Sequence, residues 1–153
     1  MEKDFALYKT PFGYLRMTYA GDRIIDLEIT TDVKNNGVAT KVTDMAYGEI
    51  TEYFDGKRKE FTFPFELRGT EFQKRVWKAL CDIPYGETKT YKDIAIEVGN
   101  EKASRAVGMA CNRNPIMIAV PCHRVIGSNN KLVGYAGGID MKRRLIDMEK
   151  ENK

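Results

Sequence analysis

Signals that begin and end helices are closely spaced in the second half of the chain, which restricts that half to short helices joined by tight turns. Thr70–Gln73 has the sequence of a capping box, in which a threonine and a glutamine three residues later satisfy each other's backbone donors. Apolar residues at helical spacing follow, namely Phe72, Val76 and Leu80. Pro84–Gly86 then interrupts the pattern. We therefore predict an amphipathic helix between the box and the proline.

Two further helices are predicted directly after it. Thr90–Asp93 is another capping box, with Asp in the acidic position, and the helix that it opens stops at Gly99. Asn100 can then cap a helix over about residues 101–112. Two short helices joined by so tight a turn fit a helix-turn-helix, although an αα-corner without any nucleic-acid role has the same sequence pattern.

The third predicted helix carries mostly small side chains around one interior cation, Arg105. The small residues are Ala103, Ser104, Ala106, Gly108 and Ala110. Such a helix can pack tightly against another helix. It can equally lie shallowly against a narrow groove, with Arg105 projecting from it.

Strand signals dominate the first thirty residues. β-type alternation runs through Phe5–Thr10, Tyr14–Tyr19 and part of Ile24–Ile29, and turn signals separate these segments. They predict a meandering antiparallel sheet. A polar loop then leads to a helix that Asp44 can cap and that Gly56 can end.

The composition changes near Pro64–Gly69, which we interpret as a boundary between two lobes. We predict an α+β fold in which a small N-terminal antiparallel sheet lobe, residues 1–66, packs on a helical C-terminal lobe, residues 67–153, that contains the helix-turn-helix. The later part is the more basic one, because residues 70–153 contain 15 Lys and Arg against 10 Asp and Glu, whereas residues 1–69 contain 10 against 12. This charge suits a polyanion such as DNA, but scattered solvated lysines would give the same counts.

The bulk composition predicts a globular protein of the cytoplasm with no membrane partner. Hydrophobic residues make up 42% of the chain and charged residues 31%. No apolar run approaches the roughly 20 residues that span a bilayer, and the N-terminus lacks the basic and apolar segments of a secretory signal. The three cysteines are odd in number and lack CxxC spacing, which argues against a disulfide framework and for a reducing compartment.

Nucleophilic chemistry is predicted at Pro121–Val125. An apolar, strand-like segment, Ile116–Val120, leads into it and places Cys122 beside His123, the single histidine of the chain. A cysteine is a strong nucleophile as the thiolate, for which His123 can act as base while Arg124 supplies a cation. Adjacent side chains on an extended segment point apart, so proton transfer between them would need a bridging water or a bend before the cysteine.

Glu149 is the best candidate for the group that orients His123 by accepting its second N–H. It lies near the end of a final helix, about residues 140–150, and directly follows the apolar face of that helix. The face consists of Met141, Leu145 and Met148.

The sequence offers no pattern for a metal or a cofactor, and we expect neither. One histidine and three scattered cysteines give no zinc-type ligand spacing. The chain also lacks a glycine-rich phosphate loop and a dinucleotide-binding motif.

The segment Pro121–Val125 resembles the active-site signature of the O6-alkylguanine-DNA alkyltransferase family. The resemblance extends from about Thr70 to Glu149, and the N-terminal lobe is compatible with the family without a motif of its own. The motifs are Pro121–Val125, the helical Arg105–Gly108, the Asn112–Pro115 turn and the Gly134–Gly138 loop.

The resemblance implies direct-reversal DNA repair, in which an alkyl group passes irreversibly from O6-alkylguanine, with O4-alkylthymine as a further candidate substrate, to Cys122, once per molecule. It implies that His123 acts through water as the base of Cys122 and that Glu149 orients His123. It also implies that Asn114 holds the turn that carries the cysteine and that Tyr91 donates a proton to the guanine.

The partner implied by the resemblance is double-stranded DNA containing O6-alkylguanine, bound by a monomer through the minor groove with the damaged base flipped out of the stack. Arg105 would fill the gap in the duplex, and Ser104 and Ala106 would lie against the DNA. Tyr135 and Ala136 would wall the pocket. Some family members have a serine where Ala136 stands, and some bind a structural zinc in the N-terminal lobe, where this chain has neither cysteine nor histidine.

Two other functions fit parts of the sequence. A non-catalytic damage-recognition protein on the same scaffold would bind alkylated DNA and recruit other proteins, but such relatives lack the cysteine. A thiol hydrolase with a Cys-His pair would leave the helix-turn-helix and the basic C-terminal half unexplained. An intact mass after incubation with an alkylated oligonucleotide separates these functions from alkyl transfer.

Overall fold

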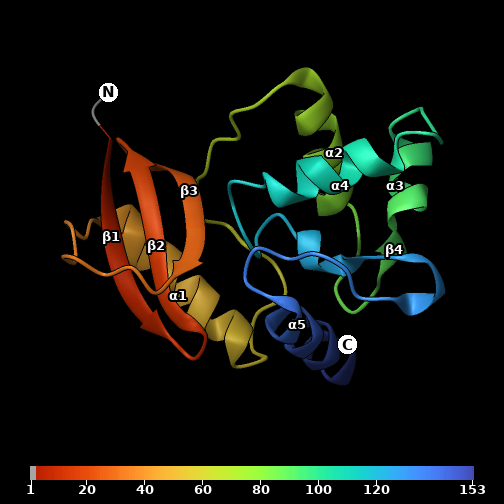
Figure 1. Cartoon of the computed structure of the whole chain (residues 1–153). Helices are drawn as coiled ribbons and strands as arrows, with labels where there is room; N and C mark the ends of the chain where they lie inside the picture. The colour runs from red at the N-terminus through yellow and green to blue at the C-terminus, as the bar shows by residue number, and fades with distance from the viewer. Residues whose placement is uncertain (1–2) are drawn as a thin grey trace. The chain divides into compact units, whose positions relative to one another are not determined.

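A three-stranded antiparallel sheet opens the chain (Figure 1). The computed structural model describes residues 3–153; residues 1 and 2, where the predicted N-terminal lobe begins, lie outside it. The strands are β1 (Lys3–Thr10), β2 (Gly13–Ala20) and β3 (Arg23–Thr30), paired in that order. Alternate residues of β2 are buried, as expected of a sheet with one covered face. The predicted meandering antiparallel sheet is confirmed.

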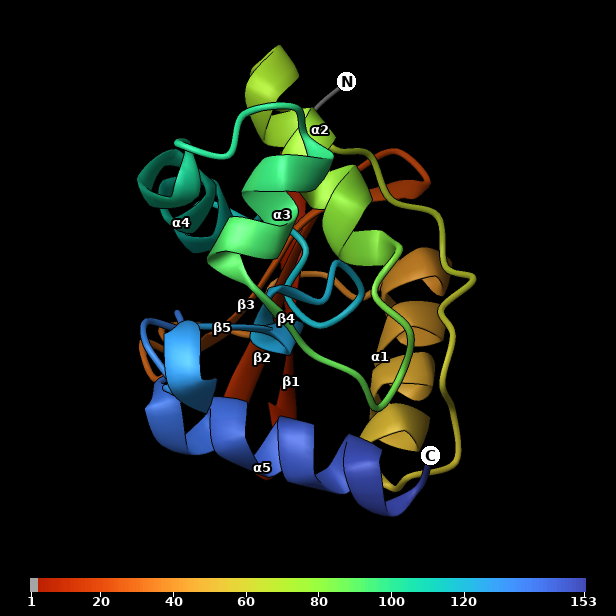
Figure 2. The same ribbon diagram turned by 90° about the vertical axis from the view of Figure 1, so that its right-hand side faces the viewer.

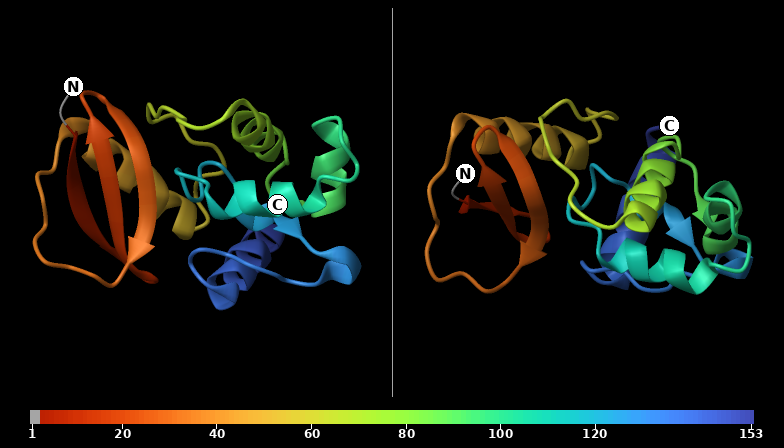
Figure 3. Two further views of the ribbon diagram at one scale, coloured as in Figure 1. Left: turned by 45° about the horizontal axis from the view of Figure 1, so that its top comes forward. Right: turned by 90° about the horizontal axis from the view of Figure 1, so that it is seen from above.

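Helix α1 (Lys41–Phe54) lies along one face of this sheet (Figures 1 and 3). The prediction that Asp44 caps it is wrong. Thr40 is the N-cap: its hydroxyl accepts from the backbone N–H of Thr43, and Thr43 reciprocates in a capping box. Because Thr40 already satisfies these donors, the helix begins earlier, and Asp44 lies within its first turn.

The first of two compact units comprises the sheet, α1, the chain as far as Arg68, and the distant segment Pro115–Met117. That segment belongs here because Ile116 pairs with Leu27 of β3. The buried carboxylate of Glu49 accepts hydrogen bonds from the hydroxyl and backbone N–H of Thr62 at 2.6 and 2.7 Å, which fixes the segment after α1.

The second unit contains four α-helices and two 3₁₀ turns around a short parallel ladder of two strands. It comprises Gly69–Asn114 and Ile118–Lys153. Figure 2 shows β4 and β5 between the α3–α4 pair and α5. Its elements are α2 (Glu71–Cys81), β4 (Lys89–Thr90), α3 (Tyr91–Glu97), α4 (Ser104–Asn112), the 3₁₀ turn η1 (Cys122–Arg124), β5 (Val125–Ile126), a second 3₁₀ turn η2 (Ser128–Asn130) and α5 (Ile139–Glu151).

The sheet and helices confirm the predicted α+β fold class, and α3 packs against α4 as the predicted pair of short helices, joined by residues 98–103. Both predicted capping boxes are present, Thr70 with Gln73 and Thr90 with Asp93. The predicted start of the third helix, at about residue 101, is wrong, because α4 begins at Ser104. The side chain of Asn100 instead accepts from the N–H of Lys102, so it closes a turn over residues 100–102, ahead of the helix. No helix among residues 3–153 combines the length and the apolar character that crossing a bilayer requires.

The apolar segment Ile116–Val120 is not the strand that the sequence predicts. Ile118 has a backbone φ of +76°, which a β-branched residue rarely adopts, and a turn covers residues 118–119. Burial alone explains the apolar run, because Ile116, Ile118 and Val120 are almost inaccessible. The chain then turns at Pro121 and enters η1.

Candidate active site

Cys122 is the first residue of η1, immediately before β5. Pro121 turns the chain with a ψ of 65°, and its carbonyl accepts from the N–H of Arg124 at 3.0 Å. The segment is therefore not extended at Cys122 but bends at Pro121, which is one of the two predicted alternatives, and the 3₁₀ turn separates successive side chains by about 120°. β5 pairs in parallel with β4, which positions this turn beside the start of α3. Cys122 is 7% exposed.

His123 and Glu149 form a buried pair behind the cysteine. Nε2 of His123 lies 2.6 Å from Oε2 of Glu149, and both side chains are almost fully inaccessible. Glu149 comes from the last turns of α5, as the sequence predicts for the final helix, so the structure brings the two residues together across 26 positions.

Arg124 contacts Glu149 rather than serving the thiol as a neighbouring cation. Its Nε donates to Oε1 at 2.8 Å, Nη2 donates to Oε2 at 3.2 Å, and Nη1 donates to the carbonyl of Ile83 at 2.7 Å. The backbone N–H of Gly86 adds a fourth bond to the carboxylate, at 3.1 Å. Burial alone would raise the pKa of Glu149, but the hydrogen bonds from His123 and Arg124 lower it to about 2. Glu149 is therefore ionised and accepts the Nε2 proton.

Burial also affects the protonation states of His123 and Cys122. It lowers the pKa of His123, against the opposing effect of Glu149, so the imidazole is neutral near pH 7. It raises the pKa of the Cys122 thiol. Because Nε2 of His123 is engaged with Glu149, Nδ1 is the nitrogen at which the ring can accept a proton.

Asn114 holds the segment that carries the cysteine. Its Nδ2 donates to the carbonyl of Val120 at 2.7 Å. The same side chain hydrogen-bonds Cys122, which lowers the thiol pKa and partly offsets burial. Asn114 therefore contacts both the backbone turn and the sulfur.

Tyr91 and Lys142 lie at the loop beyond the cysteine. The Tyr91 hydroxyl donates to the carbonyl of Val133 at 3.1 Å, and burial raises the Tyr91 pKa to about 12. Lys142, on α5, donates to the carbonyls of Val133 and Gly134 at 3.0 and 3.3 Å. Its positive charge lowers the pKa of Cys122.

The sequence analysis missed Lys142, although a signal was available. Lys142 is fully buried, and it lies at helical spacing with two apolar residues and with Glu149. These residues are Leu145, Ile146 and Glu149. A lysine in phase with the buried face of a helix marks a charge that the interior must accommodate.

Tyr135 lies beside the catalytic candidates, whereas Ala136 is exposed in the same loop. The Tyr135 ring is edge-on to the His123 ring, with centroids 6.4 Å apart. Its hydroxyl is buried and, within residues 3–153, has no hydrogen-bond partner.

Helix α4 turns a different surface to solvent from the one its composition suggested. Arg105 and Ala106 are exposed and Ser104 is half-buried, but Ala103 and Ala110 are buried. The small residues therefore lie on two faces of the helix. Ala103 and Ala110 pack inside the unit, whereas Ala106 lies on the surface.

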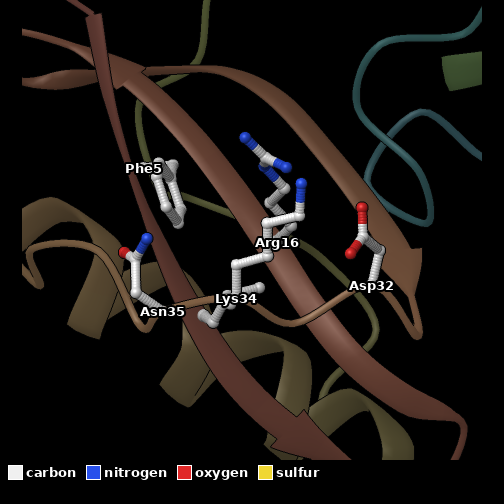
Figure 4. A pocket seen from close by; sticks show the side chains of 6 residues that line it. Phe5, Arg16, Asp32, Lys34 and Asn35 are labelled. Carbon is white, nitrogen blue, oxygen red and sulfur yellow. The ribbon is translucent and has the colours of Figure 1, made fainter.

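A separate hollow of about 280 Å³ lies on the sheet of the first unit (Figure 4). The Arg16 guanidinium stacks 4.5 Å from the centroid of the Phe5 ring there, and residues from the segment after β3 complete the lining. Its lining contains neither cysteine nor histidine, so it offers no nucleophile of the kind predicted. Across residues 3–153, no three His, Cys, Asp or Glu side chains gather as a metal site would require.

Two family models match the chain. The model described as "6-O-methylguanine DNA methyltransferase, DNA binding domain" matches residues 71–151. The model of the ribonuclease-like domain of the same methyltransferase matches residues 5–67.

Individual proteins show the same similarity. The chain is 57% identical over 104 residues to a methylated-DNA–protein-cysteine methyltransferase of Methanosarcina barkeri, covering 68% of this chain and 66% of the relative. It is 59% identical over 102 residues to an inducible one of Bacillus subtilis, covering 67% and 57%. The chain therefore matches less than two thirds of the length of either relative.

A solved structure extends the similarity over both units. The crystal structure of Mycobacterium tuberculosis OGT in complex with DNA superimposes with a TM-score of 0.88 at 43% identity. The match covers 97% of this chain and 93% of that protein.

Proposed function

The chain belongs to the 6-O-methylguanine DNA methyltransferase family, and from that membership we propose that it repairs DNA by transferring an alkyl group from O6-alkylguanine irreversibly to Cys122. The observation that carries the proposal is the buried 2.6 Å contact between His123 and Glu149 directly behind Cys122. A pair of this kind activates a neighbouring nucleophile. O4-alkylthymine is a second candidate substrate.

His123 and Glu149 are the proposed base and its orienting group. The neutral His123 ring takes the thiol proton at Nδ1 through a bridging water, and the ionised Glu149 stabilises the imidazolium that forms. The Cys122 thiolate attacks the alkyl carbon, a C–S bond forms, and the C–O bond to guanine breaks. Arg124 keeps Glu149 ionised throughout.

Tyr91 and Asn114 complete the proposed catalytic set. The departing guanine takes a proton from the Tyr91 hydroxyl, which must first leave the carbonyl of Val133. Asn114 fixes the turn through Val120 and donates to the sulfur, which favours the thiolate. Each group therefore acts on a different atom of the reaction.

Double-stranded DNA is the proposed partner, bound by a monomer in the minor groove with the damaged base flipped out. A base buried in the stack is out of reach of a thiol held inside the protein, and flipping costs a few kcal/mol of stacking. Arg105, exposed on α4, would fill the gap, with Ser104 and Ala106 against the duplex. Tyr135 and Ala136 would wall the pocket. The M. tuberculosis structure with DNA supports this partner.

We propose that the two lobes of the chain have different roles. Residues 67–153 carry DNA binding and the alkyl acceptor, because every proposed site residue lies there, and residues 1–66 form an accompanying lobe. We propose a cytoplasmic location, consistent with three free cysteines.

An intact-mass measurement tests the function. Incubation with duplex containing O6-methylguanine should add one methyl group to the protein, on the peptide containing Cys122. The Cys122→Ala variant should gain nothing yet still bind the duplex. An unchanged wild-type mass with tight binding would indicate a damage-recognition protein, and an unchanged mass with release of a small product would indicate a hydrolase.

A further inference from the structure

Met109 lies at the centre of the exposed face of α4. Its side chain is 58% exposed, the largest fraction among the exposed large hydrophobic residues of the described chain. At about 100° per residue, Met109 is only about 40° around the helix from Arg105. Arg113, also exposed, lies on its other side. The opposite face of α4 is buried; it consists of Val107, Ala110 and Cys111.

A groove of about 270 Å³ runs beside Met109, between α4 and the first turn of α2. Met109 lies between this groove and Arg105 on the helix surface, because its direction falls between those of Ala106 and Arg105. The groove residues are Thr70, Phe72, Gln73, Ala106, Met109, Ala110 and Arg113.

The charges around Met109 favour a polyanion such as DNA over a protein partner with a neutral or basic surface. Arg105 and Arg113 flank it, and α4 carries no acidic residue. A helix cannot present Arg105 to a duplex without presenting Met109 too, because the two share one face. Met109 therefore projects a large apolar side chain from the exposed face of a helix that otherwise carries mostly small side chains.

We propose that Met109 enters the minor groove beside Arg105 and acts as an apolar wedge at a base step near the lesion; this rests on the proposed function. Four residues of helix rise about 6 Å and base pairs stack about 3.4 Å apart, so the wedge acts within about two base pairs of the gap that Arg105 fills. Methionine is one of the apolar side chains that minor-groove proteins insert between base steps.

The wedge has a defined consequence for repair. Partial unstacking near the lesion lowers the cost of flipping the damaged base, because some stacking is already lost. Methionine is unbranched and flexible, so it can adapt to any base pair at that step. Met109 therefore determines how efficiently the protein acts on duplex DNA, without reading the sequence.

Two substitutions at Met109 and one control separate the wedge from a general surface effect. Met109→Gln keeps side-chain length and helix propensity but adds polarity, whereas Met109→Leu stays apolar. Ile96→Gln is the control, because Ile96 is 53% exposed on α3, outside the α4 face. Binding is measured in the Cys122→Ala background, with 2-aminopurine placed one, two or three base pairs from O6-methylguanine.

The expected result is an increase in 2-aminopurine fluorescence within two base pairs on binding, retained by Met109→Leu and lost by Met109→Gln. Met109→Gln should also weaken duplex binding about five- to tenfold and lower the ratio of duplex rate to free O6-benzylguanine rate. Unchanged fluorescence and affinity in Met109→Gln, or an equal loss in Ile96→Gln, would overturn the wedge. If the wild type fails to take a methyl group from duplex at all, the proposed function itself fails.

Discussion

Tyr91 and Lys142 donate to the same acceptor, the carbonyl oxygen of Val133, at 3.1 and 3.0 Å. The Lys142 ammonium also lies 5.8 Å from the centroid of the Tyr91 ring. When Tyr91 turns toward a substrate, Lys142 still satisfies that carbonyl, so the loop keeps its anchor. The shared acceptor couples the proposed proton donor to the buried cation that acts on Cys122.

Replacing Lys142 with Met should slow alkyl transfer and shift its pH dependence upward. The cation lowers the pKa of Cys122, so its loss raises that pKa further and leaves less thiolate at a given pH. Because the thiolate is the nucleophile, the transfer rate near pH 7 should fall with the fraction of thiolate that is lost. The test is the rate of reaction with free O6-benzylguanine from pH 6 to 10, compared between the wild type and Lys142→Met. The exposed Lys150→Met is the control. Identical profiles for the two variants would contradict the electrostatic role.

Arg105→Ala should slow repair of methylated duplex far more than reaction with free O6-benzylguanine, because only the duplex requires a base to be flipped. Lys102→Ala, an exposed change three residues before Arg105, is the matched control for lost positive charge. The ratio of the two rates is the measurement. If both substrates lose equally, Arg105 supports the pocket or the fold instead.

Glu149→Gln should change how stability depends on pH. The folded pKa of Glu149 is about 2 against an ordinary 4.5, so its ionisation stabilises the fold above about pH 4.5, and this stabilisation is lost as the pH falls toward 2. The shift corresponds to on the order of 3 kcal/mol. Urea unfolding of both proteins from pH 7 to 3 should show a difference that shrinks with acidification. The exposed Asp147→Asn should show no such trend, and a constant difference in Glu149→Gln would refute the prediction.

Each molecule should react once. Transfer to Cys122 makes a thioether, which is not activated for hydrolysis, and the chain has no second histidine and no CxxC pair to resolve it. Titration with excess methylated duplex should plateau at one methyl per active molecule. Continued turnover beyond that plateau would rule out the mechanism.

The alkylated protein should melt at a lower temperature than the unreacted one. Cys122 is 7% exposed, so an added methyl group overpacks its surroundings, typically by about 1–3 kcal/mol. Melting curves before and after a stoichiometric reaction measure the difference. An unchanged melting temperature would show that the site has room for the adduct.

Local signals in the sequence predicted the elements whose ends are determined by neighbouring residues. The capping boxes at Thr70 and Thr90 form as predicted, because each needs only a hydroxyl and a partner three residues away. Two predicted helix caps were wrong because another local interaction is formed instead. Thr40 caps α1 ahead of Asp44, and Asn100 closes a turn ahead of α4.

The segment around the cysteine shows where sequence reasoning stopped. The apolar run after Pro115 indicated burial correctly but not backbone shape, since a buried turn and a buried strand need the same residues. The parallel pairing of β4 with β5 joins positions 35 or more apart and has two residues in each strand. So short a ladder leaves no periodic pattern.

The sequence by itself determined which groups are available: one histidine, a cysteine beside it, and a carboxylate near the end of the last helix. Only the tertiary structure decided what each one faces. Folding brings Glu149 to His123 and gives Arg124 to Glu149 instead of to the thiol. It also buries Lys142 near the sulfur, because α5 packs its charged and apolar residues on one inward face. Protonation states depend on burial and on charges from distant segments, and those distances exist only once the chain has folded.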